Sequence, residues 1–153
     1  MPRRAFAAVV AAGMLTLAGC GIPVDPSGTL DRIDSGLVRV GASPSGALVT
    51  IEGTRVSGEL AHLVEAFAQE RGARVEWVVG SEEELVAGLE EGRLDLAIGG
   101  MTDATPWADR VSVTRGFPTI PGSQGDPVVI LLQMGENGTQ AALERFLDET
   151  VAP

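Results

Sequence analysis

Two short segments carry the polar groups that are best placed to bind a small molecule. The first is residues 42–45, Ala-Ser-Pro-Ser, and the second is residues 99–103, Gly-Gly-Met-Thr-Asp. Each follows a run typical of a β-strand, and the glycines leave backbone N–H groups open to approach. Thr102 and Thr105 add hydroxyls, and Trp107 follows them. These groups suit a small polar molecule with a carboxylate or a hydroxyl. An ordinary turn, whose threonines cap the next helical turn, fits the same residues equally well.

Groups that could perform catalysis are scarce. His62 is the sole histidine, and it stands beside a core-facing position of a predicted helix, so no Ser-His-Asp or Cys-His arrangement can be built around a cleft. Cys20 is the sole cysteine, and the sequence has no His-x-Glu pair or Asp-rich loop for a metal. The glycines 99–100 follow a strand as in a phosphate-binding loop, but the chain has no lysine to complete one. We therefore expect no enzymatic activity, no cofactor and no metal.

The apolar pattern predicts the elements that position these segments. Strands are predicted at residues 37–42, 74–79 and 94–98, and helices at 60–68 and from the capping box of Ser81 to Gly92. Alternating strands and helices at this spacing predict right-handed crossovers and a parallel sheet. Residues 47–56 resemble a weak hairpin. Further strands are predicted at 111–114 and 127–134, before a helix capped by Asn137. The expected fold is a three-layer α/β domain with a mainly parallel sheet and an antiparallel strand. Ligands of such sheets bind beyond the carboxyl ends of the strands.

The N-terminus has the pattern of a secretory leader. Two arginines precede an apolar run that ends in Leu-Ala-Gly-Cys at residues 17–20. The run is too short to cross a bilayer. Its ending resembles a bacterial lipobox, in which Cys20 is acylated and becomes the mature N-terminus. The alternative is an ordinary signal peptide and a chance cysteine. We predict a leader at residues 1–19, a lipid-anchored tether at 20–35, a single domain at 36–151 and a place on the extracytoplasmic side of the bacterial cell envelope.

The charge balance restricts the partners. The chain has 11 basic and 21 acidic residues and a net charge of −10. Such an excess of acid argues against nucleic acid and anionic lipid headgroups as partners of the domain.

Several segments together resemble the family 3 extracellular solute-binding proteins, the polar-amino-acid receptors of bacterial ABC importers. The most specific is residues 89–102, Leu-Glu-Glu-Gly-Arg-Leu-Asp-Leu-Ala-Ile-Gly-Gly-Met-Thr. Residues 37–41, Gly58-Glu59 with the helix after it, Thr105-Pro106, 113–117 and 135–147 also match. The resemblance implies one lobe of a periplasmic-binding-protein type 2 fold. With the two polar segments it gives an expected ligand-binding set of Ser43, Gly99, Gly100, Met101, Thr102, Thr105, Trp107 and Arg115.

The sequence departs from this family at three places. Its members have two lobes, whereas residues 116–126 are a short loop here, so the second lobe is expected to be absent. The arginine that grips a ligand carboxylate in the family, three residues after the threonine, is replaced by Ala108. The aromatic residue after the first strand is also missing from residues 43–48.

Three functions remain open at this point. The first is a solute-binding lipoprotein of an ABC importer, for a small polar solute such as an amino acid. The second is a single-lobe interaction or sensory module that has lost its ligand. The third is an enzyme, because a few solute-binding-like proteins are dehydratases, but the lack of acid–base pairs argues against it.

Overall fold

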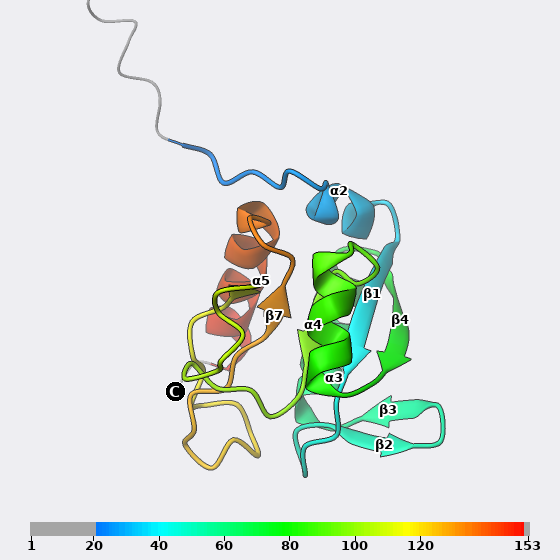
Figure 1. Cartoon of the computed structure of the whole chain (residues 1–153), viewed down its shortest axis with the longest axis vertical. Coiled ribbons are helices and arrows are strands. Elements are labelled where there is room, and N and C mark those ends of the chain that lie inside the picture. The colour runs from blue at the N-terminus through cyan, green and yellow to red at the C-terminus, as the bar shows by residue number, and fades with distance from the viewer. Residues whose placement is uncertain (1–20, 152–153) are drawn as a thin grey trace, which may run out of the picture.

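The computed structural model describes residues 21–151, which form a sheet with helices on both faces (Figure 1). The leader and Cys20 lie outside the described residues. The elements, labelled as in Figure 1, are α2 (Thr29–Asp34), β1 (Leu37–Ala42), β2 (Thr50–Glu52), β3 (Arg55–Ser57), α3 (Glu59–Glu70), β4 (Arg74–Val79), α4 (Glu82–Glu90), β5 (Leu96–Ile98), β6 (Ser112–Val113), β7 (Leu131–Leu132) and α5 (Asn137–Thr150).

The main sheet has the order β4-β1-β5-β7-β6, and β2 and β3 form a separate hairpin. β1 pairs in parallel with β4 and β5, so Val40 lies between Trp77 and Leu96. β7 runs antiparallel to β5 on one side and to β6 on the other. The sheet therefore confirms the predicted fold class, a mainly parallel α/β sheet with antiparallel strands.

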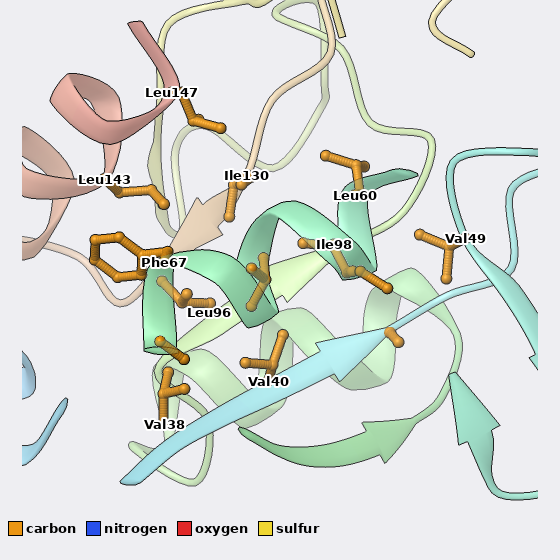
Figure 2. Close-up of a cluster of buried hydrophobic side chains, with 14 of the residues drawn as sticks. Val38, Val40, Val49, Leu60, Phe67, Leu96, Ile98, Ile130, Leu143 and Leu147 are labelled. Carbon is orange, nitrogen blue, oxygen red and sulfur yellow. The ribbon is translucent and has the colours of Figure 1, made fainter. Parts of the chain in front are cut away.

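Alternate residues of the central strands face opposite layers, as the period of a strand requires. Leu96 and Ile98 of β5 join the larger core, which packs against α3 and α5 (Figure 2). Ala97, between them, joins the smaller core, which includes Leu85 and Leu89 of α4. The sheet is thus the middle of three layers, with α3 and α5 on one face and α4 on the other.

Asp95 lies directly before β5 and is 1% exposed. Its carboxylate accepts hydrogen bonds from the side chains of Arg32 and Arg39, each with a bond of 2.7 Å to Oδ1, and from the Arg39 N–H at 2.8 Å. The side-chain hydrogen bond to Asp95 raises the pKa of Arg39 above its usual value. The sequence predicts a buried strand at residues 94–98 with its carboxylate at an end or cap. Leu94 and Leu96 are buried as expected, but β5 is shorter than the predicted strand, and Asp95 lies just before its first residue.

The N-terminal segment differs from the predicted tether of residues 20–35. Residues Thr29–Asp34 form α2, and Ile33 is fully buried in the larger core. The cause is an exchange of caps between two helices that are far apart in the sequence. The Glu136 carboxylate, before α5, accepts from the Ser27 and Thr29 N–H groups at 2.8 and 3.0 Å. The first N–H groups of a helix have no hydrogen-bond partner within the helix, and the Glu136 carboxylate supplies one at the start of α2.

Asp25 supplies the other half of this exchange. Its carboxylate accepts from the N–H and the hydroxyl of Thr139, in the first turn of α5, and from the N–H of Leu30. The predicted cap, Asn137, is instead the first residue of α5, and Glu136 precedes it without a side-chain cap of its own. The prediction was wrong because the capping carboxylate comes from a position 114 residues away.

The last predicted strand, residues 127–134, is ladder-paired only at Leu131–Leu132. Val128 instead makes isolated bridges with Thr102 and Phe117, so this part of the chain joins loops to the sheet. None of the helices in residues 21–151 combines the length and the hydropathy of a membrane span.

Candidate functional site

A cavity of about 300 Å³ lies beyond the carboxyl ends of β1 and β5. Small-molecule sites in proteins start at about this volume. One wall comes from the loop after β1, the floor from the segment after β5, and the other wall from the loop of residues 116–126. The lining residues are Ser45, Gly46, Ala47, Leu48, Gly100, Thr102, Gly122, Ser123, Gln124, Asp126 and Val128.

Backbone hydrogen bonds fix the first wall. The Ser43 N–H donates to the Ile98 carbonyl at 3.0 Å, which continues the β1–β5 pairing past the end of β1. The Ala47 and Leu48 carbonyls accept from the first two N–H groups of α3. This close contact needs Gly58 before the helix, because it has a φ of 112° and a Cβ would lie 2.6 Å from the Leu48 oxygen. The start of α3 therefore holds the loop against the cavity.

The floor approaches the first wall too closely for a side chain. A Cβ on Gly100 would lie 2.4 Å from the Ser45 hydroxyl oxygen, and one on Gly99 would lie 3.3 Å from the Ser43 Cβ. The two glycines thus let the loops after β1 and β5 touch. Gly100 is exposed at the floor of the cavity, whereas Met101 is buried in the smaller core.

The second wall is a packed loop. The Phe117 N–H donates to the Val128 carbonyl at 2.8 Å, and this bond closes the loop at its base. Phe117 and Ile120 are buried in the larger core. The buried Ser123 hydroxyl donates to the Pro118 carbonyl at 2.8 Å and accepts from the Gly125 N–H. Residues 116–126 are therefore ordered by their own contacts.

The charges of the lining favour one class of ligand. Asp126 is the sole charged residue among the described residues that line the cavity. Ser45, Thr102 and Gln124 add polar groups. Without an arginine or lysine in this lining, a carboxylate would face the acidic side chain with no cation to balance it. The lining thus suits a neutral or positively charged polar molecule better than an anion.

The structure brings together only part of the ligand-binding set expected from the sequence. Gly100 and Thr102 line the cavity. Ser43, Gly99 and Met101 belong to the same two loops but do not line it. Sequence reasoning missed Ser45, although the segment that contains it was singled out. It also missed the residues between 122 and 128, because no local pattern shows that their loop folds back over the sheet.

Trp107 and Thr105 lie outside the cavity. The Trp107 indole N–H donates to a Glu82 carboxylate oxygen at 3.2 Å, and the Arg110 guanidinium lies 5.4 Å from the centre of its ring. Arg110 also binds Glu90 of α4, and this hydrogen bond lowers the pKa of the Glu90 carboxyl below its usual value. Trp107 is partly exposed and packs against the smaller core. The Thr105 hydroxyl oxygen is shielded from solvent without a hydrogen-bond partner.

Arg115 is also drawn away from the cavity. Its side chain pairs with Asp148 of α5 and lies 4.3 Å from the centre of the Phe117 ring, and its N–H donates to Glu144. It lines a separate depression of about 250 Å³ beside α5.

In the described part of the chain, no group of three or more His, Cys, Asp or Glu side chains could hold a metal ion.

Solved structures with the same fold include arginine-binding proteins. The arginine-bound domain 1 of TmArgBP superposes with a TM-score of 0.67 and 21% identity, over 78% of this chain and 98% of that domain. An ancestral arginine-binding protein bound to arginine superposes with a TM-score of 0.62 and 14% identity, over 75% of this chain and 92% of that protein. A truncated, arginine-bound ArgBP from T. maritima superposes with a TM-score of 0.52 and 22% identity, over 57% of this chain and 42% of that chain.

No protein-family model matches the chain, and no curated protein matches its sequence. At these identities the structural likeness shows the fold alone. The described residues have the fold of a single domain of a solute-binding protein.

Proposed function

We propose that the chain is an extracytoplasmic solute-binding lipoprotein of an ABC importer, which captures a small polar solute such as an amino acid. The cavity carries the proposal, because it lies at the carboxyl ends of parallel strands, where ligands of such sheets bind. The neighbours in fold include arginine-binding proteins, and the lipobox-like sequence that ends at Cys20 supports a place on the cell envelope. The negative charge of Asp126 in the lining favours a neutral or cationic solute over an anionic one.

Binding by the isolated mature protein is expected to be weak. Residues 116–126 replace a lobe with a loop, so a solute keeps only part of the contacts that a closed two-lobe receptor would give. If such a receptor binds at about 1 μM, or −8.2 kcal/mol, half of that energy corresponds to about 1 mM. Calorimetry on a verified monomer should therefore give a millimolar dissociation constant for arginine, a weaker one for glutamine and none measurable for glutamate.

A matched pair of variants tests whether this cavity is the site. Asp126→Asn removes the carboxylate of the lining and is expected to weaken arginine binding. Asp103→Asn removes a carboxylate that is also exposed but lies outside the lining, and it should have a smaller effect. If the two changes weaken arginine binding equally, the solute binds outside this cavity. A dissociation constant of 10 μM or tighter for any amino acid would contradict the incomplete-cleft argument.

A second candidate is an interaction or sensory module that no longer binds a solute. The observation that favours it is the single-domain cavity, which is open where a second lobe would close it. Thermal unfolding distinguishes the two functions. At 10 mM, a solute with a 1 mM dissociation constant stabilises the native state by about 1.4 kcal/mol and raises the melting temperature. A panel of amino acids and polyols that leaves the melting temperature unchanged would favour the module.

A substitution of Cys20 tests the proposed lipid anchor. Cys20→Ala is expected to release the protein from the membrane fraction, because both cleavage and acylation of a lipobox require that thiol. Two or more acyl chains hold a protein firmly where one chain is marginal. Fractionation of cells that express the parent and the variant measures the loss. If the variant stays in the membrane fraction as firmly as the parent, the lipid-anchor proposal is wrong.

A further inference from the structure

One turn in the second wall of the cavity has an unusual backbone. Gln124 has a φ of 57°, and it is the only residue other than glycine with a positive φ in the part of the chain that the structure describes. Gly125 follows with a φ of 89°, and the Asp126 N–H donates to the Ser123 carbonyl at 3.0 Å. Two positive φ values inside such a bond define a type I′ turn, whose first central position is usually glycine, asparagine or aspartate. Glutamine is therefore a strained choice at this position.

The surrounding contacts hold this turn in place. Ser123 is buried, and its hydroxyl donates to the Pro118 carbonyl and accepts from the Gly125 N–H. Gly122 lies so close to the first wall that a Cβ on it would be 3.3 Å from the Ala47 Cβ. The turn is thus fixed on both sides and stands against the loop after β1. Strained residues other than glycine that their surroundings hold in place are concentrated at ligand-binding sites.

The same turn carries two lining groups with complementary chemistry. Gln124 and Asp126 are both exposed, and both line the cavity. An ionised aspartate only accepts hydrogen bonds, whereas a glutamine amide offers two N–H donors. Because no arginine, lysine or histidine stands among the described residues of the lining, Gln124 supplies its only side-chain N–H groups. This pair matches an ammonium group and a carboxylate on one carbon atom, as in an α-amino acid.

We propose that Gln124 determines the specificity of the cavity for α-amino acids. Its amide donates to the solute carboxylate, while the Asp126 carboxylate accepts from the ammonium group on the same carbon. The inference rests on the proposed solute-binding function and assigns the head group of the solute to one turn. Glycine would fit this turn without strain, but it would leave the lining without an amide to bind the carboxylate.

Removal of the amide tests the proposal with two related solutes. Arginine carries the carboxylate, and agmatine, its decarboxylated form, lacks it. The parent and Gln124→Gly are expressed from the full chain, purified in detergent and titrated with each solute while NMR shifts of backbone amides are followed. Gln124→Gly should weaken arginine binding about tenfold, through the loss of a hydrogen bond to a charged group, and leave agmatine binding unchanged. Because glycine relieves the positive φ, the melting temperature of the variant should not fall.

Thr119→Gly is the matched control, because Thr119 is an exposed polar residue of the same loop that lies outside the lining. It should leave the dissociation constants of both solutes as they are in the parent. If Gln124→Gly weakens the binding of the two solutes equally, or of neither, or if Thr119→Gly causes the same selective loss, the assignment of the carboxylate to Gln124 is wrong. If neither solute binds the parent, the proposed function itself fails, and this inference fails with it.

Discussion

Replacing Asp95 with alanine is expected to lower the free energy of unfolding by about 3 kcal/mol, within the range of about 3–5 kcal/mol for removal of one partner of a buried ion pair. The change leaves two guanidinium groups, those of Arg32 and Arg39, beside the sheet without their shared carboxylate. The lower end of the range applies because the Arg32 side chain is 34% exposed and can regain water. Urea unfolding of the parent and the variant measures the difference.

Two controls separate this network from ordinary charge effects. Asp34→Ala removes a half-exposed carboxylate that pairs with Arg71, and it should cost about 0–1 kcal/mol. Asp95→Asn keeps the shape and an acceptor oxygen, so it should cost less than the alanine change. If Asp95→Ala is no more destabilising than Asp34→Ala, the three-residue network does not stabilise the fold.

Leu96→Ala is expected to cost about 2–5 kcal/mol, because it opens a cavity at a fully buried position. β5 lies between β1 and β7, and Leu96 faces the core shared with Phe67 of α3 and Leu143 of α5 (Figure 2). Few atoms there can move to fill the space without loosening a second layer. For a domain with a stability of about 5–15 kcal/mol, this loss is a large part of the total.

Val79→Ala is the comparison for this change. Val79 lies on the edge strand β4 and is 46% exposed, so its truncation should cost much less. Thermal and urea unfolding of both variants give the two values. If Leu96→Ala were as stable as Val79→Ala, the position of β5 in the centre of the sheet would be contradicted.

The strands and helices that build the layers could be predicted from the sequence, because each depends on the pattern of residues that are close together in the chain. The strands at 37–42 and 74–79 and the capping box at Ser81 are all present with the predicted bounds. Ser81 and Glu84 cap α4 through bonds within four residues of chain, which a local pattern reveals. The caps of α2 and α5 connect residues more than 100 positions apart, and no local pattern contains them.

The same distinction explains the candidate site. Gly100 and Thr102 follow directly from the end of a strand, and they line the cavity. Trp107 and Arg115 were also close in sequence to the predicted ends of strands. Each was drawn elsewhere by a partner from a different element, Trp107 by Glu82 and Arg115 by Asp148. Asp126 depends on a loop that closes through Phe117 and Val128, and this closure is a tertiary contact.

The exchange of caps between the two ends of the domain also sets an order of events during synthesis. Asp25 cannot meet Thr139, and Ser27 and Thr29 cannot meet Glu136, until more than 100 further residues have been synthesised, because these partners lie 107 to 114 positions apart. Closing a loop of that length costs about 4 kcal/mol of chain entropy, which only a largely folded sheet can offset. The N-terminal segment therefore docks on the domain late, after the sheet has formed. If residues 1–19 are the leader that we propose, the enzymes that process it act on this segment before it docks.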